Sequence, residues 1–237
     1  MKWKANAKKI WHFIWEEDSA WSWIVNIALA FVLIKFIVYP GLAFFLGTTH
    51  PVVAVVSSSM EHNSIKSCSD NGIRDALSGN AGKCESYKYT MCGNVYDEKK
   101  HFSLDEYWQE CGAWYENLDI SKEEFSKFRY KNGFNKGDIM VLKGIAPEKI
   151  SRGDVMVFFS NRNDPIIHRV VNKNGSEGGI IIHTKGDNNE DSIRGGALDE
   201  TKIKEDAVIG EAVIRIPLLG YIKIWFADIT RVLGISK

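Results

Sequence analysis

The chain has 237 residues, with 30 Lys and Arg against 30 Asp and Glu, so its formal net charge is zero. This balance argues against a nucleic-acid-binding protein, because such proteins usually carry a basic excess. Hydrophobic residues make up 45% of the sequence and only five residues are proline, which excludes a disordered chain. The length allows one domain with an anchor, or one domain with a large insertion.

A long apolar segment runs from Trp21 to Leu46, with Lys35 as its only charged residue. Roughly 20 apolar residues suffice to cross a bilayer, whereas the apolar core of a cleavable signal peptide has only about 7–15. We therefore expect an uncleaved transmembrane anchor over residues 21–46. We expect Lys35 to snorkel toward the interface; the alternative is a partner subunit that supplies an acceptor within the membrane.

The segment of residues 1–20 precedes the anchor and is short and amphipathic. Its basic side chains predict the orientation of the protein, since Lys and Arg are enriched on the cytoplasmic side of membrane segments. By this rule residues 1–20 are cytoplasmic and the rest of the protein is extracytoplasmic. The lysines that carry this prediction are Lys2, Lys4, Lys8 and Lys9.

Residues 61–133 differ from the rest in being polar and in holding all the cysteines. An even number of cysteines in a short extracytoplasmic stretch predicts two disulfides, without fixing which of three pairings forms. A zinc site is the alternative, but the cysteine spacing lacks the C-x₂₋₄-C pattern typical of such sites. Capping boxes at Ser103 and Ser121 predict two helices, so we expect a disulfide-tied, partly helical insertion. The cysteines are Cys68, Cys84, Cys92 and Cys111.

The remaining sequence, residues 47–60 and 134–237, predicts an antiparallel β domain. Short apolar runs, two of them preceded by a Gly-Asp turn, recur at the spacing typical of such domains. The tail after Ile214 predicts a last strand and then a helix, which either lies at the membrane interface or packs on the core. The runs are Gly137–Leu142, Gly153–Phe159, Ile166–Val171 and Gly179–Thr184.

A cluster of serines directly follows the β-branched run of residues 52–56, which predicts a buried strand. Ser59 at the end of such a rigid element is a candidate nucleophile, although a serine needs a base to activate it. His168 in a β run is a candidate base, and Asp187 or Asp191 in a polar turn a candidate acid. Each alone is typical of ordinary structure, but the set Ser, His and Asp is compatible with a catalytic triad.

These segments resemble the sequence boxes of the type I signal peptidases of the archaeal and endoplasmic-reticulum branch. His62 stands where the family usually has a proline, and residues 61–133 match no part of the family pattern. The bacterial branch uses a Ser-Lys pair, whereas a His-Arg-Val box is typical of the histidine-using branch. The matching segments are Ser57–Met60, Gly153–Phe158, Ile167–Val170, Lys185–Asn189 and the closing strand Gly210–Gly220.

The resemblance implies a mainly β, signal-peptidase-like antiparallel domain with one N-terminal transmembrane helix and an α-containing, Cys-bearing insertion. It implies a membrane-anchored serine endopeptidase without cofactor or metal, which removes signal peptides after small residues at −1 and −3. Its location would be the cell membrane of an archaeon or the endoplasmic reticulum. Its partners would be preprotein signal peptides, membrane lipid and the translocation machinery. The alternatives are a non-catalytic anchored accessory protein and a peptidase dedicated to one surface protein.

The resemblance also implies roles for single residues. Ser59 attacks the scissile carbonyl, His168 is its base, and an aspartate orients the imidazole. Asp191 is favoured as this acid if a short deletion aligns it with the family's second aspartate; Asp187 is the alternative acid or a supporting residue. The N–H of Ser59 and the hydroxyl of Ser57 would hold the oxyanion. The candidate substrate contacts are Val53, Val55 and Met60.

Overall fold

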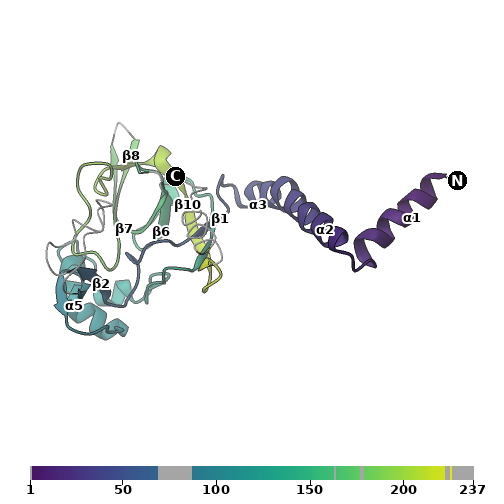
Figure 1. Ribbon diagram of the computed structural model, residues 1–237. Helices are drawn as coiled ribbons and strands as arrows, with labels where there is room; N and C mark the ends of the chain where they lie inside the picture. Colours follow the sequence, from purple (N-terminus) through teal and green to yellow (C-terminus); the bar gives the residue numbers. More distant parts are fainter. Residues whose placement is uncertain (1, 69–86, 163, 177–178, 222–224, 226–237) are drawn as a thin grey trace. The chain divides into compact units, whose positions relative to one another are not determined.

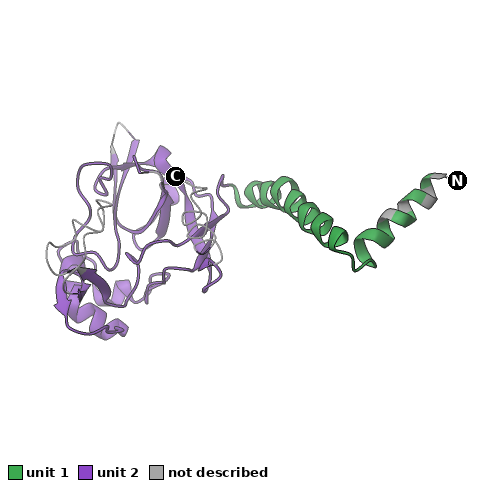
Figure 2. Cartoon of the chain, viewed as in Figure 1, with its two compact units in different colours: residues 1–47 green, residues 48–237 purple. Residues whose placement is uncertain are grey.

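The computed structural model describes residues 2–68, 87–162, 164–176, 179–221 and 225. The chain divides into two compact units, residues 1–47 and residues 48–237 (Figure 2). The described secondary structure of the first unit is helical, whereas the second unit holds all the described strands.

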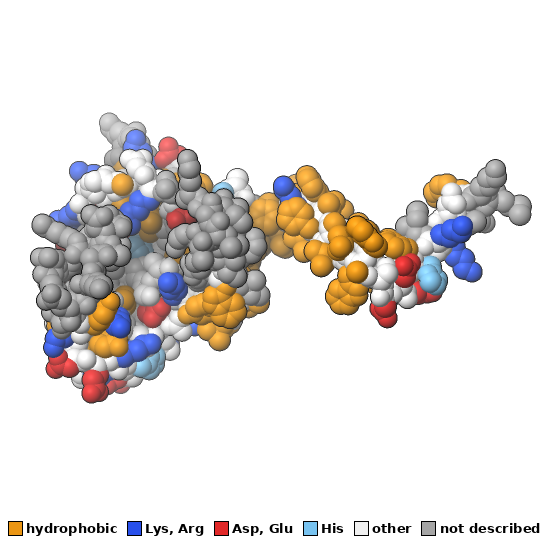
Figure 3. Space-filling view, in the orientation of Figure 1, with side chains coloured by type: hydrophobic (Ala, Val, Ile, Leu, Met, Phe, Trp, Pro, Cys, Tyr) orange, Lys and Arg blue, Asp and Glu red, His pale blue; other side chains and the backbone are white. Residues whose placement is uncertain are grey.

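The first unit consists of helix α1 (Lys2–Trp15) and a second helical stretch from Ala20 to Leu46. Ser19 begins the second stretch, because its side chain accepts a hydrogen bond from the Ser22 N–H. This stretch is long and apolar enough to cross a membrane, by length and composition. Hydrophobic side chains cover its surface (Figure 3).

The second helical stretch changes its winding at its centre. Helix α2 (Ala20–Leu33) passes into a π-helical turn (Ile34–Val38) and then into α3 (Tyr39–Leu46). Proline lacks an N–H and its ring clashes with the carbonyl four residues earlier in an α-helix. Pro40 is the second residue of α3, and the residue four positions before it, Phe36, lies in the wider π turn, which accommodates the proline ring. The turn also holds Lys35, whose ammonium lies 5.5 Å from the Phe36 ring centroid.

The second unit is built on one antiparallel sheet of seven strands (Figure 1), which confirms the predicted fold class. The strand order is β1-β5-β10-β6-β7-β8-β9, so β1 lies at one edge. Two short 3₁₀ turns, Pro147–Lys149 and Glu205–Ala207, connect strands. The strands are β1 (Val52–Ala54), β5 (Ile139–Lys143), β6 (Val155–Phe158), β7 (Ile166–Ser176), β8 (Gly179–Lys185), β9 (Ile203–Lys204) and β10 (Val208–Ile216).

The described part of residues 61–133 forms a small three-stranded sheet and two helices. Both predicted N-caps are confirmed: Ser103 makes a reciprocal capping box with Glu106, and Ser121 accepts from the Glu124 N–H. The helices pack on β7 through a shared apolar cluster that includes Val171. The elements are β2 (Ile65–Cys68), β3 (Tyr87–Met91), β4 (Asn94–Tyr96), α5 (Leu104–Glu116) and α6 (Lys122–Phe125).

Cys92 and Cys111 form a disulfide, which confirms one of the predicted bonds. The second predicted bond needs Cys84, which lies outside the described residues. Within the described part of the chain, no group of three or more His, Cys, Asp or Glu side chains could hold a metal ion. The expected last strand is β10, while most of the expected helix after it falls in residues 222–224 and 226–237, which are not described.

Candidate active site

The structure brings the predicted nucleophile and base together. Ser59 lies in a turn after β1, and His168 lies on strand β7, between β6 and β8. The Ser59 Oγ is 2.8 Å from the His168 Nε2, although the residues are 109 positions apart in the chain. The Ser57 hydroxyl lies 3.1 Å from the Ser59 hydroxyl. His168 is buried and Ser59 is half-buried, so solvent reaches the pair from the serine side.

A glutamate completes this hydrogen-bonded row. The His168 Nδ1 hydrogen-bonds to the carboxylate of Glu200, which is fully buried. The same carboxylate accepts from the Thr184 hydroxyl at 3.0 Å and from the Ile193 N–H at 2.8 Å. Burial raises the pKa of Glu200, but the nearby His168 and these hydrogen bonds outweigh it and lower the pKa overall. The residue that orients the histidine is therefore an ionised glutamate, which the sequence did not single out.

In the described structure, neither of the two expected aspartates hydrogen-bonds to the His168 ring. Asp187 is fully buried and accepts two hydrogen bonds from Arg169, at 2.8 and 2.7 Å. Burial raises the pKa of Asp187, but the Arg169 charge outweighs it and holds the pKa well below its usual range. Asp191 is exposed and accepts from the Trp114 indole N–H at 2.9 Å. Both ring nitrogens of His168 are occupied by Ser59 and Glu200 instead.

Arg169 is fully buried, and all five of its N–H donors find acceptors. Three of them point to the main-chain carbonyls of Arg129, Tyr130 and Gly153, and two to Asp187. A buried charge is tolerated only when it is paired and hydrogen-bonded, and this pair meets both conditions. The Asp187–Arg169 pair is thus a structural unit directly beside the candidate catalytic histidine.

His62 extends this buried unit. Its Nε2 lies 3.2 Å from the second Asp187 oxygen, and its ring stacks on Tyr107 with centroids 3.8 Å apart. Burial is the main effect on His62 and lowers its pKa, so the ring is neutral at pH 7. A neutral ring that donates through Nε2 matches this contact.

Two of the three expected substrate contacts are inaccessible. Val55 and Met60 are each only 1% exposed and belong to the apolar core beneath the sheet. Val53 is half-buried and packs against the same core. The strand alternates between faces, so every second residue of this run points inward. A peptide at this site would therefore meet the backbone of β1 rather than the side chains of Val55 and Met60.

The turn of residues 185–191 passes very close to the reacting atoms. The Asn188 N–H donates to the Ser59 carbonyl at 2.8 Å. A Cβ on Gly186 would lie 2.8 Å from the His168 Nε2 and 2.9 Å from the Ser59 carbonyl oxygen. Glycine is needed here because of this close approach, not because of its backbone angle.

Lys185 is fully buried at the start of this turn. Its ammonium donates to the Gly186 carbonyl at 3.2 Å. It lies 5.0 Å from the Trp114 ring centroid and 5.1 Å from the Tyr115 ring centroid. Burial lowers its pKa to about 8. Aromatic faces thus replace a carboxylate as its main neighbours.

No protein-family model matches the chain. Curated relatives do match it. The chain is similar to catalytic subunits of the signal peptidase complex. The subunit SEC11 of Yarrowia lipolytica is 32% identical over 98 residues, 40% of this chain and 56% of that protein. SEC11 of Colletotrichum graminicola is 34% identical over 110 residues, 43% of this chain and 63% of that protein.

The human relative, the catalytic subunit SEC11C of Homo sapiens, is 33% identical over 98 residues, 40% of this chain and 51% of that protein. The chain thus spans between 51% and 63% of the length of these three relatives. The matches confirm the resemblance to the signal peptidases that the sequence boxes indicated.

Proposed function

We propose that the chain is a membrane-anchored serine endopeptidase that removes signal peptides from preproteins. The observation that carries the proposal is the row Ser59–His168–Glu200, in which the Ser59 Oγ lies 2.8 Å from the His168 Nε2. A serine becomes a nucleophile only next to such an oriented base. The similarity to signal peptidase catalytic subunits supports this choice of substrate among the serine hydrolases.

In the proposed reaction, the Ser59 Oγ attacks the scissile carbonyl while the His168 Nε2 takes its proton. The same proton then passes from His168 to the leaving amine, and the new N-terminus departs. Water hydrolyses the resulting acyl-enzyme by the same route in reverse. Glu200 holds the imidazole in the tautomer that presents an unprotonated Nε2, and it stabilises the imidazolium that forms.

The developing oxyanion needs donors that are already in place. The Ser59 N–H and the Ser57 hydroxyl are the proposed donors. The Ser57 hydroxyl lies 3.1 Å from the Ser59 hydroxyl. It can rotate toward the oxyanion that forms on the carbonyl carbon attacked by Ser59. Ser57 is exposed, so a substrate can reach it.

The proposed substrate binds as an added strand along β1. This strand pairs with β5 on one side and is the terminal strand of the described sheet, so its other side offers main-chain groups to a peptide. An extended peptide points alternate side chains toward the enzyme, which fits a preference for small residues at −1 and −3. The buried Val55 and Met60 support this edge from the core side.

The helical stretch of residues 20–46 is the proposed anchor, and the lysines before it support a cytoplasmic location for residues 1–20. Ser59 follows Leu46 by 13 positions in the chain (59 − 46). At about 3.3 Å per residue, this tether limits the distance between the nucleophile and the end of the proposed anchor to about 43 Å, a reach that suits a substrate held in the same membrane.

The test uses the full chain in detergent micelles with a preprotein that carries an intact signal peptide. We expect one new N-terminus, directly after a small residue, identified by sequencing of the product. The Ser59→Ala protein is expected to leave the preprotein intact, with Ser58→Ala as the matched control that retains activity. Equal cleavage by the Ser59→Ala protein would refute the proposal.

A further inference from the structure

One face of helix α5 rests on the turn of residues 185–191. Tyr107, Cys111, Trp114 and Tyr115 follow the spacing i, i+4, i+7 and i+8, so they share one side of the helix. Tyr107, Cys111 and Tyr115 are buried. This helix belongs to residues 61–133, the part of the chain that matches no box of the signal peptidases.

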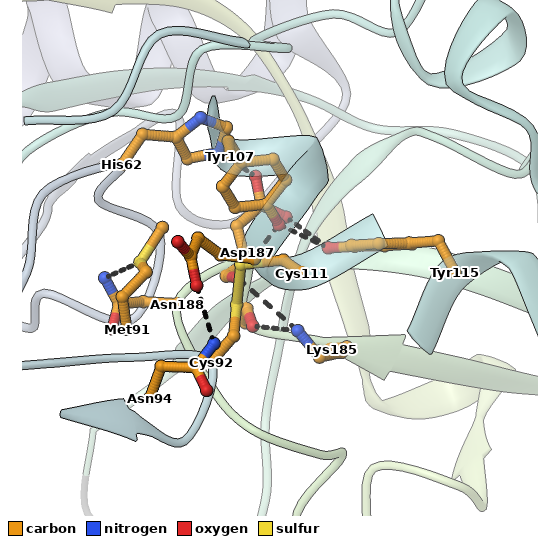
Figure 4. The surroundings of a disulfide bond; sticks show 12 residues. His62, Met91, Cys92, Asn94, Tyr107, Cys111, Tyr115, Lys185, Asp187 and Asn188 are labelled. Atoms are coloured by element: carbon orange, nitrogen blue, oxygen red, sulfur yellow. Dashed lines mark hydrogen bonds and ion pairs between the residues drawn. A yellow bond between two sulfur atoms is a disulfide. The ribbon is translucent and has the colours of Figure 1, made fainter. Parts of the chain in front are cut away.

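Two tyrosine hydroxyls of this face hold Asp187 (Figure 4). The Tyr107 hydroxyl donates to the Asp187 carbonyl at 2.9 Å, and the Tyr115 hydroxyl donates to its carboxylate at 3.2 Å. Both tyrosines are completely buried, and burial raises the pKa of each well above its ordinary value, so both remain donors. The backbone and the side chain of Asp187 are thereby fixed from the same helix.

The disulfide and Trp114 add contacts on either side of Asp187. Cys111 is bonded to Cys92, whose N–H donates to the Asn188 carbonyl at 2.9 Å. The Trp114 indole donates to Asp191. Helix α5 and its disulfide thus contact the turn from Asp187 to Asp191.

The other side of this turn contacts the reacting residues. The Asn188 N–H donates to the Ser59 carbonyl at 2.8 Å, and Gly186 lies against the His168 Nε2. Asp187 also binds Arg169, the residue after His168. A displacement of the turn would therefore move both Ser59 and His168.

We propose that helix α5, tied by the Cys92–Cys111 disulfide, is a positioning element of the active site. Tyr107 and Tyr115 are its positioning residues: neither contacts Ser59 or His168 directly, and both act through the turn. The inference rests on the proposed peptidase function. Misplacement of reacting groups by 1 Å can cost about 100-fold in rate, so a brace of this kind matters to catalysis.

The test compares preprotein cleavage by Tyr115→Phe and by the wild-type full chain in detergent. The change removes one hydrogen bond to a charged group and keeps the ring in place, so we expect kcat to fall about tenfold. KM should stay within about twofold, because Tyr115 does not touch the peptide edge. Tyr87→Phe is the matched control and should keep wild-type kcat, since Tyr87 is exposed on β3 and its ring faces Lys66.

A purely structural role would lower Tm and leave the kcat of the folded fraction unchanged, so Tm and the folded fraction are measured in parallel. A wild-type kcat in Tyr115→Phe overturns the inference. Should Tyr115→Phe not fold, Tyr107→Phe replaces it, because Asp187 then keeps all its carboxylate partners; a wild-type kcat overturns the inference here too. Cleavage by Ser59→Ala would instead refute the proposed function, so the two failures are distinguishable.

Discussion

Replacing Glu200 with Gln is expected to disable His168 while keeping the shape of the buried side chain. In the native site one Glu200 oxygen binds the His168 Nδ1 and the Thr184 hydroxyl, and the other accepts from the Ile193 N–H. A glutamine has only one oxygen for these two positions. If its oxygen faces Ile193, its NH₂ faces His168 and forces the proton onto Nε2, so the ring cannot take the Ser59 proton. If its oxygen faces His168, two N–H groups oppose each other at Ile193.

The expected loss of kcat follows from these two arrangements of the glutamine side chain. Both arrangements also remove the negative charge that stabilises the imidazolium. An Asp-to-Asn change in a well-studied serine protease triad lowers kcat about 10⁴-fold. We expect a loss of about 10³- to 10⁴-fold, which corresponds to about 4–5 kcal/mol of transition-state stabilisation.

The assay is the kcat for preprotein cleavage by Glu200→Gln and by Asp191→Asn, with Tm measured for both. Asp191→Asn is the matched control, because Asp191 is exposed and bound to Trp114 rather than to His168. We expect it to retain kcat within about threefold. The reverse result, a severe loss in Asp191→Asn and near-normal activity in Glu200→Gln, would refute the assignment of the acid.

Three further changes test other parts of the structure. Gly186→Ala places a Cβ 2.8 Å from the His168 Nε2 and should lower kcat about 100-fold, whereas Gly175→Ala, with open space around it, should leave kcat unchanged; equal activities would contradict the close approach. Burial lowers the pKa of Lys185 to about 8 from an unfolded value of about 10.5, so the unfolded state binds more protons and Tm should rise between pH 8 and 10. This rise should be smaller in Lys185→Met, and identical slopes would count against the burial. Ser103→Ala removes the N-cap of α5 and should lower the free energy of unfolding by about 1 kcal/mol; no change in chemical denaturation would contradict it.

The strands were predictable because their signals are local. The run Gly153–Phe159 contains β6, and the run Ile166–Val171 begins β7, since turn residues and apolar runs act over a few positions. The sequence predicted helices from their capping boxes, but not that α5 would contact the turn at Asp187. That contact depends on the fold of two distant segments, which no local pattern encodes.

The candidate site was predictable only where a sequence box marked it. Ser59 and His168 lie in such boxes, and the structure brings them together. Glu200 lies in an irregular loop and reaches His168 because its backbone pairs with Thr184 and Ile193. Glu200 follows Asp199 in a polar turn without an apolar run or a sequence box, so no local pattern distinguished it from an ordinary surface acid.

The buried Arg169 also determines how β7 can pair with its neighbours. Successive side chains of a strand point to opposite faces, so His168 and Arg169 face different sides of the sheet. A slip of one residue would carry the guanidinium into the place of the imidazole and leave Asp187 facing the wrong side chain. Arg169 satisfies all five of its donors in the observed alignment, so a shifted pairing of β7 would cost these hydrogen bonds. The chain thereby selects the single pairing in which a histidine stands beside Ser59.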